Sequence, residues 1–445
     1  MIILMKTLQV ILALGILVLI HEFGHFFFAK LFGIRVDKFY LFFDVGGVKL
    51  FSTKSKWFTK LFPKAEQWET EYGIGWLPLG GYCKICGMID ESMDKEQLKN
   101  EPQPWEFRTK PAWQRLLVMA GGVLFNFILA IILYVAILGI WGQAYISNEG
   151  QKVYVSELAE ELGFRDKDHI ISFDQYKPEN VNSLYIDFIQ ETPEQVTVLR
   201  DTDTVTFVID QSRIKDVLKS PDMFELAIEF TIDTIPENSP NYAADIIRGD
   251  KFVAIEGSAI EFLQDASPIL EANAGSKVDI TLVRGEDTLN RELQVDSTGR
   301  LGVILGMPEP TIKKYNILTA IPAGFKVAFD KIDLYIQNLK LVFNPSTEAY
   351  KSVGSFISIG QMFPSEWSWN IFLNHTAFLS IMLGVMNLIP IPALDGGHIM
   401  FTLYEIITRR KPSDKFLEIT QIIGMILIIG LMILAFGNDI FKLFR

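Results

Sequence analysis

The feature that most constrains this chain is a pair of histidines and a glutamate placed inside an apolar run. The run extends from about residue 8 to residue 32, and it contains His21, Glu22 and His25. In a helix, residues four apart lie about 40° apart around the axis and about 6 Å along it, so the two imidazoles can converge on one ion. Ionisable groups inside a membrane span cost about 2.5 to 3.5 kcal/mol each and are rare unless function requires them.

The spacing is that of the H-E-x-x-H arrangement, in which two histidines hold zinc and the glutamate acts as general base on a zinc-bound water. We therefore predict His21 and His25 as metal ligands and Glu22 as the catalytic base. One alternative is an interfacial histidine pair at the end of an ordinary span. Another is a cleaved signal peptide, which is disfavoured because no small-residue cleavage site follows Ile20 and the apolar character resumes at Phe26.

The composition predicts a membrane protein with a soluble insert. The chain has 445 residues, of which 49% are hydrophobic, yet its middle third is polar. A span needs roughly 20 apolar residues to cross a hydrocarbon core of about 30 Å. Four segments meet this requirement, at about 8–32, 115–140, 371–393 and 416–437.

The distribution of charge predicts the orientation of the four spans. Lysine and arginine are concentrated in residues 33–114 and again between the third and fourth spans, and such loops lie in the cytoplasm. Both termini and the polar insert, residues 141–370, are then outside. The net charge of −12 comes largely from the insert and argues against nucleic acid as a partner.

The cysteines predict no disulfide framework. Cys83 and Cys86 are the only two, and the polar insert has none, so the insert is expected to be stabilised by ordinary hydrophobic cores. A zinc or redox site at this pair would need further soft ligands nearby. We therefore expect a structural role for both thiols.

The end of the third span supplies a third metal ligand. Asp395 follows Pro390 and Pro392 at the cytoplasmic end of this span, at a depth similar to that of the two histidines. Two imidazoles and one carboxylate complete a catalytic set for one zinc ion and leave the fourth position for water. The prolines break the helix, and unwound backbone at membrane depth is tolerated only where it faces protein or a water-filled cavity. The alternative is a solvated Asp395 in a Pro-Gly turn.

Together, the two motifs resemble those of the site-2 protease family of intramembrane zinc metalloproteases. Residues 21–25 match its H-E-x-x-H, and residues 387–397 match its N-x-x-P-x-P-x-L-D-G-G. Further likeness lies at Phe107–Arg115, Ala120-Gly121-Gly122, Asn126, Leu79–Tyr82 with Lys84, and Ser355–Ile359. Within the family, the chain is similar to the bacterial regulator of sigma-E protease group. This resemblance implies a helical membrane core of four transmembrane helices with a membrane-reentrant β-loop, plus two extracytoplasmic PDZ-like α+β domains.

A degenerate repeat of about 80 residues in the insert supports the PDZ pair. Residues 168–174 echo 250–256, and residues 196–200 echo 280–284, with alternations that predict strands. The second copy has Gly249 at the PDZ turn. The first copy has Lys167 there, which argues against peptide binding by the first copy.

The expected organisation has five parts. These are a first membrane half (1–142), PDZ-like domain 1 (143–212), PDZ-like domain 2 (213–305), an amphipathic and connecting segment (306–370) and a second membrane half (371–445). The stretch from about Lys326 to Phe343 is amphipathic. It is expected either at the outer membrane surface or packed against the PDZ pair.

The predicted activity is hydrolysis of peptide bonds in the transmembrane segments of single-span membrane proteins. The resemblance implies an anti-sigma factor already trimmed by another protease as the substrate, with remnant signal peptides as a second class. It also implies a bacterial inner membrane location with the active site toward the cytoplasm. A non-catalytic PDZ scaffold, or pseudoprotease, is the alternative, and an intact Glu22 beside a complete ligand set argues against it.

Substrate-binding residues are expected in two segments of the chain. An unwound substrate is expected to pair with an edge strand at Leu79–Ile85, which contains Gly80, Gly81 and Tyr82. Asn387, just ahead of the proline break, is expected to bond the substrate backbone, and the alternative for it is a helix cap. The remaining histidines are expected to be structural: His169, His375 and His398.

Overall fold

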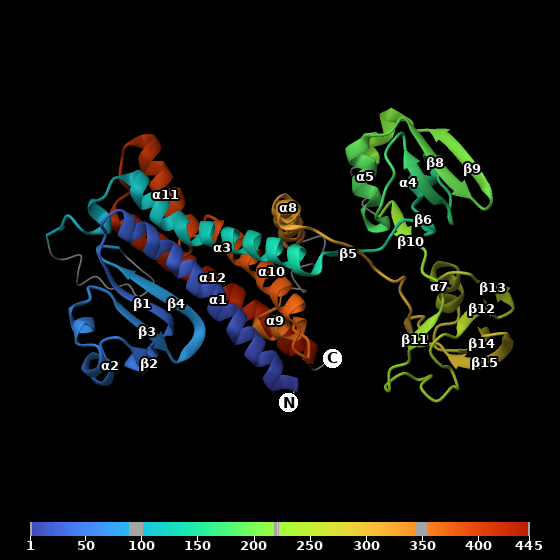
Figure 1. The fold of residues 1–445 in the computed structure, drawn as a ribbon, viewed down its shortest axis with the longest axis horizontal. Coiled ribbons are helices and arrows are strands. Elements are labelled where there is room, and N and C mark those ends of the chain that lie inside the picture. The colour runs from blue at the N-terminus through green and yellow to red at the C-terminus, as the bar shows by residue number, and fades with distance from the viewer. Residues whose placement is uncertain (1, 89–100, 218–219, 221, 344–353, 444–445) are drawn as a thin grey trace. The chain divides into compact units, whose positions relative to one another are not determined.

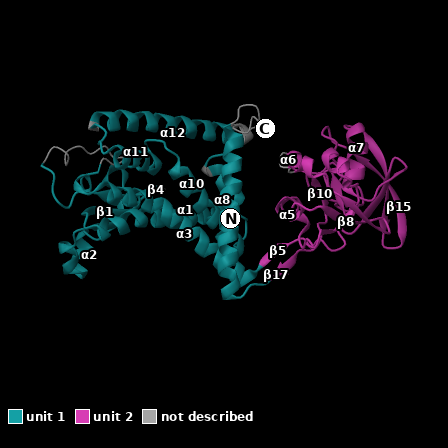
Figure 2. Ribbon diagram, turned by 90° about the horizontal axis from the view of Figure 1, so that it is seen from above, with its two compact units in different colours: residues 1–142, 314–445 teal, residues 143–313 magenta. Residues whose placement is uncertain are grey.

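The computed structural model describes residues 2–88, 101–217, 220, 222–343 and 354–443 (Figure 1). Parts of the two expected segments 33–114 and 306–370 therefore lie outside the described residues. The chain divides into two compact units (Figure 2), one formed by residues 1–142 with 314–445 and the other by residues 143–313. The first unit contains the four predicted spans and the second contains the polar insert.

Four helices of the described chain are long and apolar enough to cross a membrane, as predicted. They are α1 (Ile2–Leu31), α3 (Ala112–Trp141), α10 (Trp369–Leu388) and α12 (Asp414–Leu443). The third of them ends at Leu388, short of the expected residue 393. Its end is set by Pro390, because a residue before proline is forced out of the helical region, and Ile389 has extended φ/ψ of −62° and 136°.

Helices α1 and α3 cross so closely that only glycine fits at the crossing. A Cβ on Gly121 of α3 would stand 2.5 Å from the backbone oxygen of Gly24 of α1, closer than real Cβ atoms approach. The amphipathic helix α8 (Ile317–Val342) also packs on α3, where a Cβ on Gly324 would stand 2.5 Å from Val135 Cγ2. Neither placement expected for this helix included that contact. The first unit also contains the helices α9 (Phe356–Met362) and α11 (Asp395–Thr408).

The segment between α1 and α3 in the sequence forms a four-stranded sheet, which lies against α1 (Figure 1). Its strands are β1 (Val36–Phe43), β2 (Lys49–Ser52), β3 (Glu71–Gly75) and β4 (Leu77–Ile85), in the order β2-β3-β1-β4, and α2 (Lys56–Leu61) lies in the β2–β3 connection. Strand β4 is therefore an edge strand. A Cβ on its Gly81 would stand 2.7 Å from Val18 Cγ1, so glycine lets β4 run close beside α1.

The second unit contains two β-rich repeats, each with its own hydrophobic core. The first repeat is built from β6 (Val153–Val155), α4 (Glu157–Glu161), β7 (His169–Phe173), α5 (Leu184–Glu191), β8 (Gln195–Arg200), β9 (Asp203–Val208), α6 (Ile214–Val217) and β10 (Phe224–Leu226). The second is built from β11 (Ile232–Thr234), β12 (Lys251–Ile255), β13 (Ser258–Ala259), α7 (Leu263–Ala272), β14 (Lys277–Arg284), β15 (Asp287–Gln294) and β16 (Ile304–Leu305). Strand β5 (Gln143–Tyr145) pairs with β17 (Thr311–Lys313) at the ends of the unit. Since β10 pairs with β6, residues 224–226 pack with the first repeat, although the sequence assigned them to the second domain.

The two repeats contain the same buried ion pair. Asp168 is fully buried and accepts two hydrogen bonds of 2.8 Å from Arg200. Asp250 is fully buried and accepts bonds of 2.8 and 2.9 Å from Arg284. The segments that echo each other in the sequence are therefore equivalent strands, β7 with β12 and β8 with β14.

Candidate active site

Three side chains of the types that bind metals come from two distant parts of the chain and converge in the first unit. His21 and His25 lie on α1, and Asp395 is the first residue of α11. Asp395 Oδ2 lies 3.2 Å from His21 Nε2 and 3.3 Å from His25 Nε2, and the two Nε2 atoms are 3.3 Å apart. Among the described residues, this is the cluster of His, Cys, Asp and Glu that can hold a metal ion.

The dimensions of this cluster fit zinc. Zinc bonds of about 2.0–2.1 Å at tetrahedral angles place two ligand atoms about 3.3 Å apart. The three distances between the ligand atoms of this cluster match that value. In addition, Asp395 Oδ2 is buried without a hydrogen-bond partner, which leaves it free to bind a cation. His21, His25 and Asp395 would thus hold zinc and leave a fourth position open.

The hydrogen bonds made by Nδ1 of each imidazole leave Nε2 as the ligand atom. His25 Nδ1 lies 2.8 Å from the Val118 carbonyl oxygen, to which it donates. His21 Nδ1 lies 3.0 Å from Nδ2 of Asn126 on α3, while Asn126 Oδ1 is buried without a partner. When the oxygen and nitrogen of this amide are exchanged, the Nδ1–H of His21 donates to Asn126 Oδ1. Each histidine then presents an unprotonated Nε2.

A glycine of α3 allows the backbone to touch both imidazoles. A Cβ on Gly122 would stand 2.5 Å from His25 Nε2 and 2.6 Å from His21 Cε1. Gly122 and Asn126 thus shape the site. Sequence reasoning named both residues from the family likeness alone and gave neither a role. The Gly-Gly pair four residues before a buried asparagine was the available signal.

The predicted base lies beside the ligands. Glu22 is half-buried on α1, one residue after the ligand candidate His21. It lines one cavity of about 530 Å³ together with His21, His25 and Asp395. A carboxylate held at the wall of such a cavity can take a proton from water and return it to a leaving group.

The loop between α10 and α11 aims Asp395 at the histidines. Its backbone folds back so tightly that a Cβ on Gly396 would stand closer than 3.0 Å to Ile389 O, and one on Gly397 equally close to Pro392 Cα. Farther along α11, Glu405 pairs with the buried Arg115 of α3 at 2.5 Å. The D-G-G sequence thus has a steric cause, since larger residues would displace the loop from the start of α11.

Most predicted substrate-binding residues face this cavity. Gly81, Tyr82 and Asn387 line it, and Asn387 Nδ2 lies 3.4 Å from His21 Nε2. Gly80 does not line it and instead lies under Phe43, whose ring would be 2.6 Å from a Cβ at that position. His398, which the sequence set aside as structural, also lines the cavity.

The other expected structural residues have structural partners. His169 Nδ1 lies 2.8 Å from the Gln151 carbonyl oxygen, and His375 Nδ1 lies 2.8 Å from that of Ile371. Both cysteines are free thiols. Burial, with a hydrogen bond to a nearby aspartate, raises the pKa of Cys86 to about 12, so this thiol has little thiolate character at neutral pH.

Comparison with known proteins identifies the family. The model of peptidase family M50 matches residues 9–431. The regulators of sigma-E protease RseP from Salmonella typhimurium and Escherichia coli are each 26% identical over 464 residues, covering 97% of this chain and 98% of the relative. A protein of Clostridium perfringens named as a candidate zinc metalloprotease is 26% identical over 441 residues, 98% of both chains. The chain therefore belongs to peptidase family M50, and it is a zinc metalloprotease of the site-2 type.

Proposed function

We propose that this protease cleaves the transmembrane segments of single-span membrane proteins. The observation that carries the proposal is the position of the catalytic cavity. Its histidines lie on α1, a helix long and apolar enough to span a membrane, and its third ligand directly follows the loop after another such helix, α10. A substrate helix in the same bilayer would meet the site without leaving the membrane.

In this proposal His21, His25 and Asp395 hold one zinc ion per chain. When bound, zinc lowers the pKa of a coordinated water to about 7 and polarises the scissile carbonyl. Glu22 takes the proton of the attacking water and delivers it to the leaving amine. Helix α3 holds both histidines through the Val118 carbonyl oxygen and the Asn126 side chain.

The substrate must be unwound and held extended before attack, and β4 suits that task. As an edge strand it has one row of backbone groups that no other strand of the sheet occupies, and an extended peptide can add to such an edge. The strand contains Gly80, Gly81 and Tyr82. Asn387, which also lines the cavity, would bond the substrate backbone with its amide.

We further propose that the substrate is a trimmed anti-sigma-factor-like protein, with signal peptide remnants as a second class. The names of the RseP relatives support the first class. The lysine and arginine distribution supports a bacterial inner membrane topology in which the cavity opens toward the cytoplasm and residues 143–313 lie outside.

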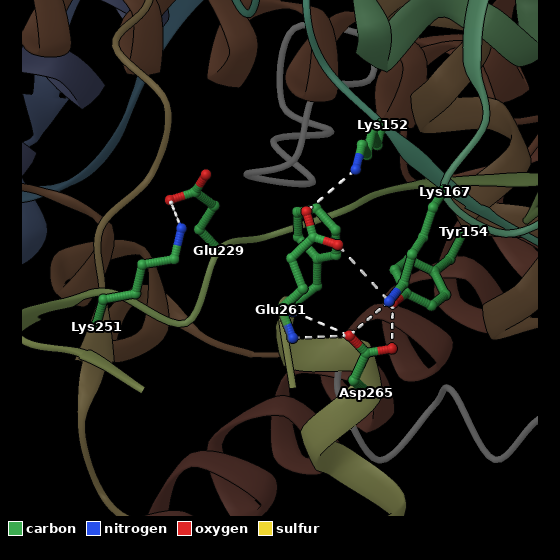
Figure 3. A network of polar contacts seen from close by, with 8 residues as sticks. Lys152, Tyr154, Lys167, Glu229, Lys251, Glu261 and Asp265 are labelled. Atoms are coloured by element: carbon green, nitrogen blue, oxygen red, sulfur yellow. Dashed lines mark hydrogen bonds and ion pairs between the residues drawn. The ribbon is translucent and has the colours of Figure 1, made fainter. Parts of the chain in front are cut away.

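The two repeats, as PDZ-like domains, would then act together as a size filter over the outer face. Charged contacts hold them to each other (Figure 3). Asp265 at the start of α7 accepts hydrogen bonds from Tyr154 at 2.6 Å and Lys167 at 2.9 Å, and Glu261 pairs with Lys152 at 3.1 Å. A pair held in this way presents one obstacle to a substrate with a folded external domain.

Reconstitution with a single-span substrate in two forms tests the proposal. One form keeps a folded external domain and the other ends in a short external tail. We expect the full chain to cleave only the short form and a variant lacking residues 147–305 to cleave both. A deletion variant that keeps zinc and cleaves the short form, yet refuses the long one, would rule out the filter. Failure of the full chain to cut either form within the bilayer would overturn the proposed activity.

A further inference from the structure

The connection between β2 and β3 places aromatic residues and lysines on one exposed surface. In α2, Lys56 and Lys60 lie four residues apart on one flank of the helix, and Trp57 and Leu61 lie four apart on the adjoining flank. The side chains of Trp57 and Leu61 are 59% and 66% exposed. Residues 53–70 contain four lysines and two glutamates, whereas the whole chain has a net charge of −12.

This exposure belongs to a folded segment. Phe58 packs its ring 5.4 Å from that of Phe51 and 5.0 Å from that of Phe62. Lys54 Nζ donates to three backbone carbonyls within residues 65–68 at 2.7 to 3.2 Å, which ties the end of the connection to its start. Four large apolar side chains nevertheless remain 44% to 66% exposed: Trp57, Leu61, Phe62 and Trp68.

The same segment is held level with one end of the membrane core. Glu69 pairs with Lys30 in the last turn of α1, and Thr70 donates to the Val36 carbonyl oxygen at 2.8 Å. Because α1 is a candidate span that ends at Leu31, these contacts hold the connection beside the end of that helix. In the proposed topology this is the cytoplasmic membrane surface.

We propose that residues 53–70 form an interfacial anchor that binds anionic lipid. Its exposed aromatic and leucine side chains would enter the boundary of the bilayer, where tryptophan is favoured because its ring is amphipathic. The exposed ammonium groups of Lys56, Lys60 and Lys64 would contact anionic headgroups while their stems lie along apolar surface. Because these lysines are positively charged, we expect the anchor to bind anionic lipid rather than neutral lipid.

The anchor is continuous with the wall of the catalytic cavity. Strand β3 follows it directly at Glu71, whose carboxylate accepts hydrogen bonds of 2.6 to 2.7 Å from Tyr40, Lys49 and Ser52. Strand β3 pairs with β1, and β1 pairs with β4, which lines the cavity. Lipid binding would thus fix the sheet that receives substrate. This consequence rests on the proposed function, but the lipid contact itself does not.

Photo-crosslinking in vesicles of equal phosphatidylcholine and phosphatidylglycerol tests the anchor. The full chain carries p-benzoylphenylalanine in place of Leu61, and the adducts are identified by mass spectrometry. We expect lipid adducts in which phosphatidylglycerol exceeds its share of the bilayer. Val208, which is 72% exposed in the polar insert, is the control position, and no lipid adduct is expected there.

The lysines are tested in the same assay. Lys56→Gln, Lys60→Gln and Lys64→Gln together should return the phosphatidylglycerol share to that of the bilayer. The matched substitutions Lys177→Gln, Lys215→Gln and Lys277→Gln in the second unit should leave it raised. Absence of lipid adducts at Leu61, adducts to protein, or an unselective lipid share in the parent chain would overturn the proposal. The readout needs no catalysis, so such a failure would leave the proposed protease activity standing.

Discussion

Gly122 lies directly against His25, so close that a Cβ on the glycine would stand 2.5 Å from the imidazole Nε2. The two residues are on different helices, α3 and α1. These helices cross closely because Gly24 and Gly121 have no side chains at the contact. The candidate metal site is therefore part of the packing between α1 and α3. Its ligands depend on the backbone of a helix that contributes no ligand.

Gly122→Ala should abolish zinc binding, because the added methyl group would occupy the space of the ligand nitrogen. Elemental analysis of the purified protein measures this. Gly139→Ala on the same helix is the matched control, since its Cβ would meet only Ala320 at an ordinary 3.8 Å. Full zinc content in the Gly122 variant would show that α3 does not confine the histidines.

Asn126→Leu should weaken zinc binding about 10–100-fold, the usual effect of removing a partner that orients a ligand histidine. Asn126→Asp should retain most of the affinity, because it keeps an oxygen that accepts the Nδ1–H of His21. Competition with a chelator measures both. Equal affinities of the two variants would contradict the role given to the amide oxygen.

Lys167→Gly should loosen the two repeats while relieving backbone strain. Lys167 has a left-handed φ of 68°, which costs a non-glycine residue about 1–2 kcal/mol, and the equivalent residue of the second repeat is Gly249 at 91°. The lysine is held in this conformation while its ammonium bonds Asp265. Hydrogen exchange should become faster in the first turn of α7. Unchanged exchange there would show that the contact does not join the repeats.

The contact at Asp265 should also fail in acid. Burial acts to raise the pKa of this carboxyl group, but hydrogen bonds from Tyr154, Lys167 and two backbone amides lower it to about 2. Because the pKa is lowered below its unfolded value of about 3.9, the stabilisation is complete above that value and is lost as the pH falls toward 2. Exchange in α7, corrected for its intrinsic rate, should rise in this window. In Asp265→Asn the rise should be absent.

The candidate metal ligands could be found from the sequence because each is a polar residue where the surrounding pattern is apolar. His21 and His25 are polar groups inside an apolar run, and Asp395 follows the break after another such run. The four spans were equally readable, since their length and apolar character are set by the bilayer. The strands of the insert were readable because the two copies repeat the same alternation.

Other features depend on contacts between segments that are distant in the sequence. No single segment could have predicted them. The role of Asn126 requires knowing that α3 crosses α1 at His21. Gly80 falls outside the cavity because Phe43 from the neighbouring strand covers it. Residues 224–226 belong with the first repeat because β10 pairs with β6, and no local pattern marks that pairing.

The central claim is that one zinc ion on His21, His25 and Asp395 works with Glu22 as the base. The most direct measurement is zinc content together with cleavage of a single-span substrate by Glu22→Gln, compared with Asp395→Ala. Glu22→Gln should keep one zinc ion per chain and lose cleavage, and Asp395→Ala should lose both. Cleavage by Glu22→Gln at a rate comparable to that of the parent chain, or full zinc content in Asp395→Ala, would contradict the account.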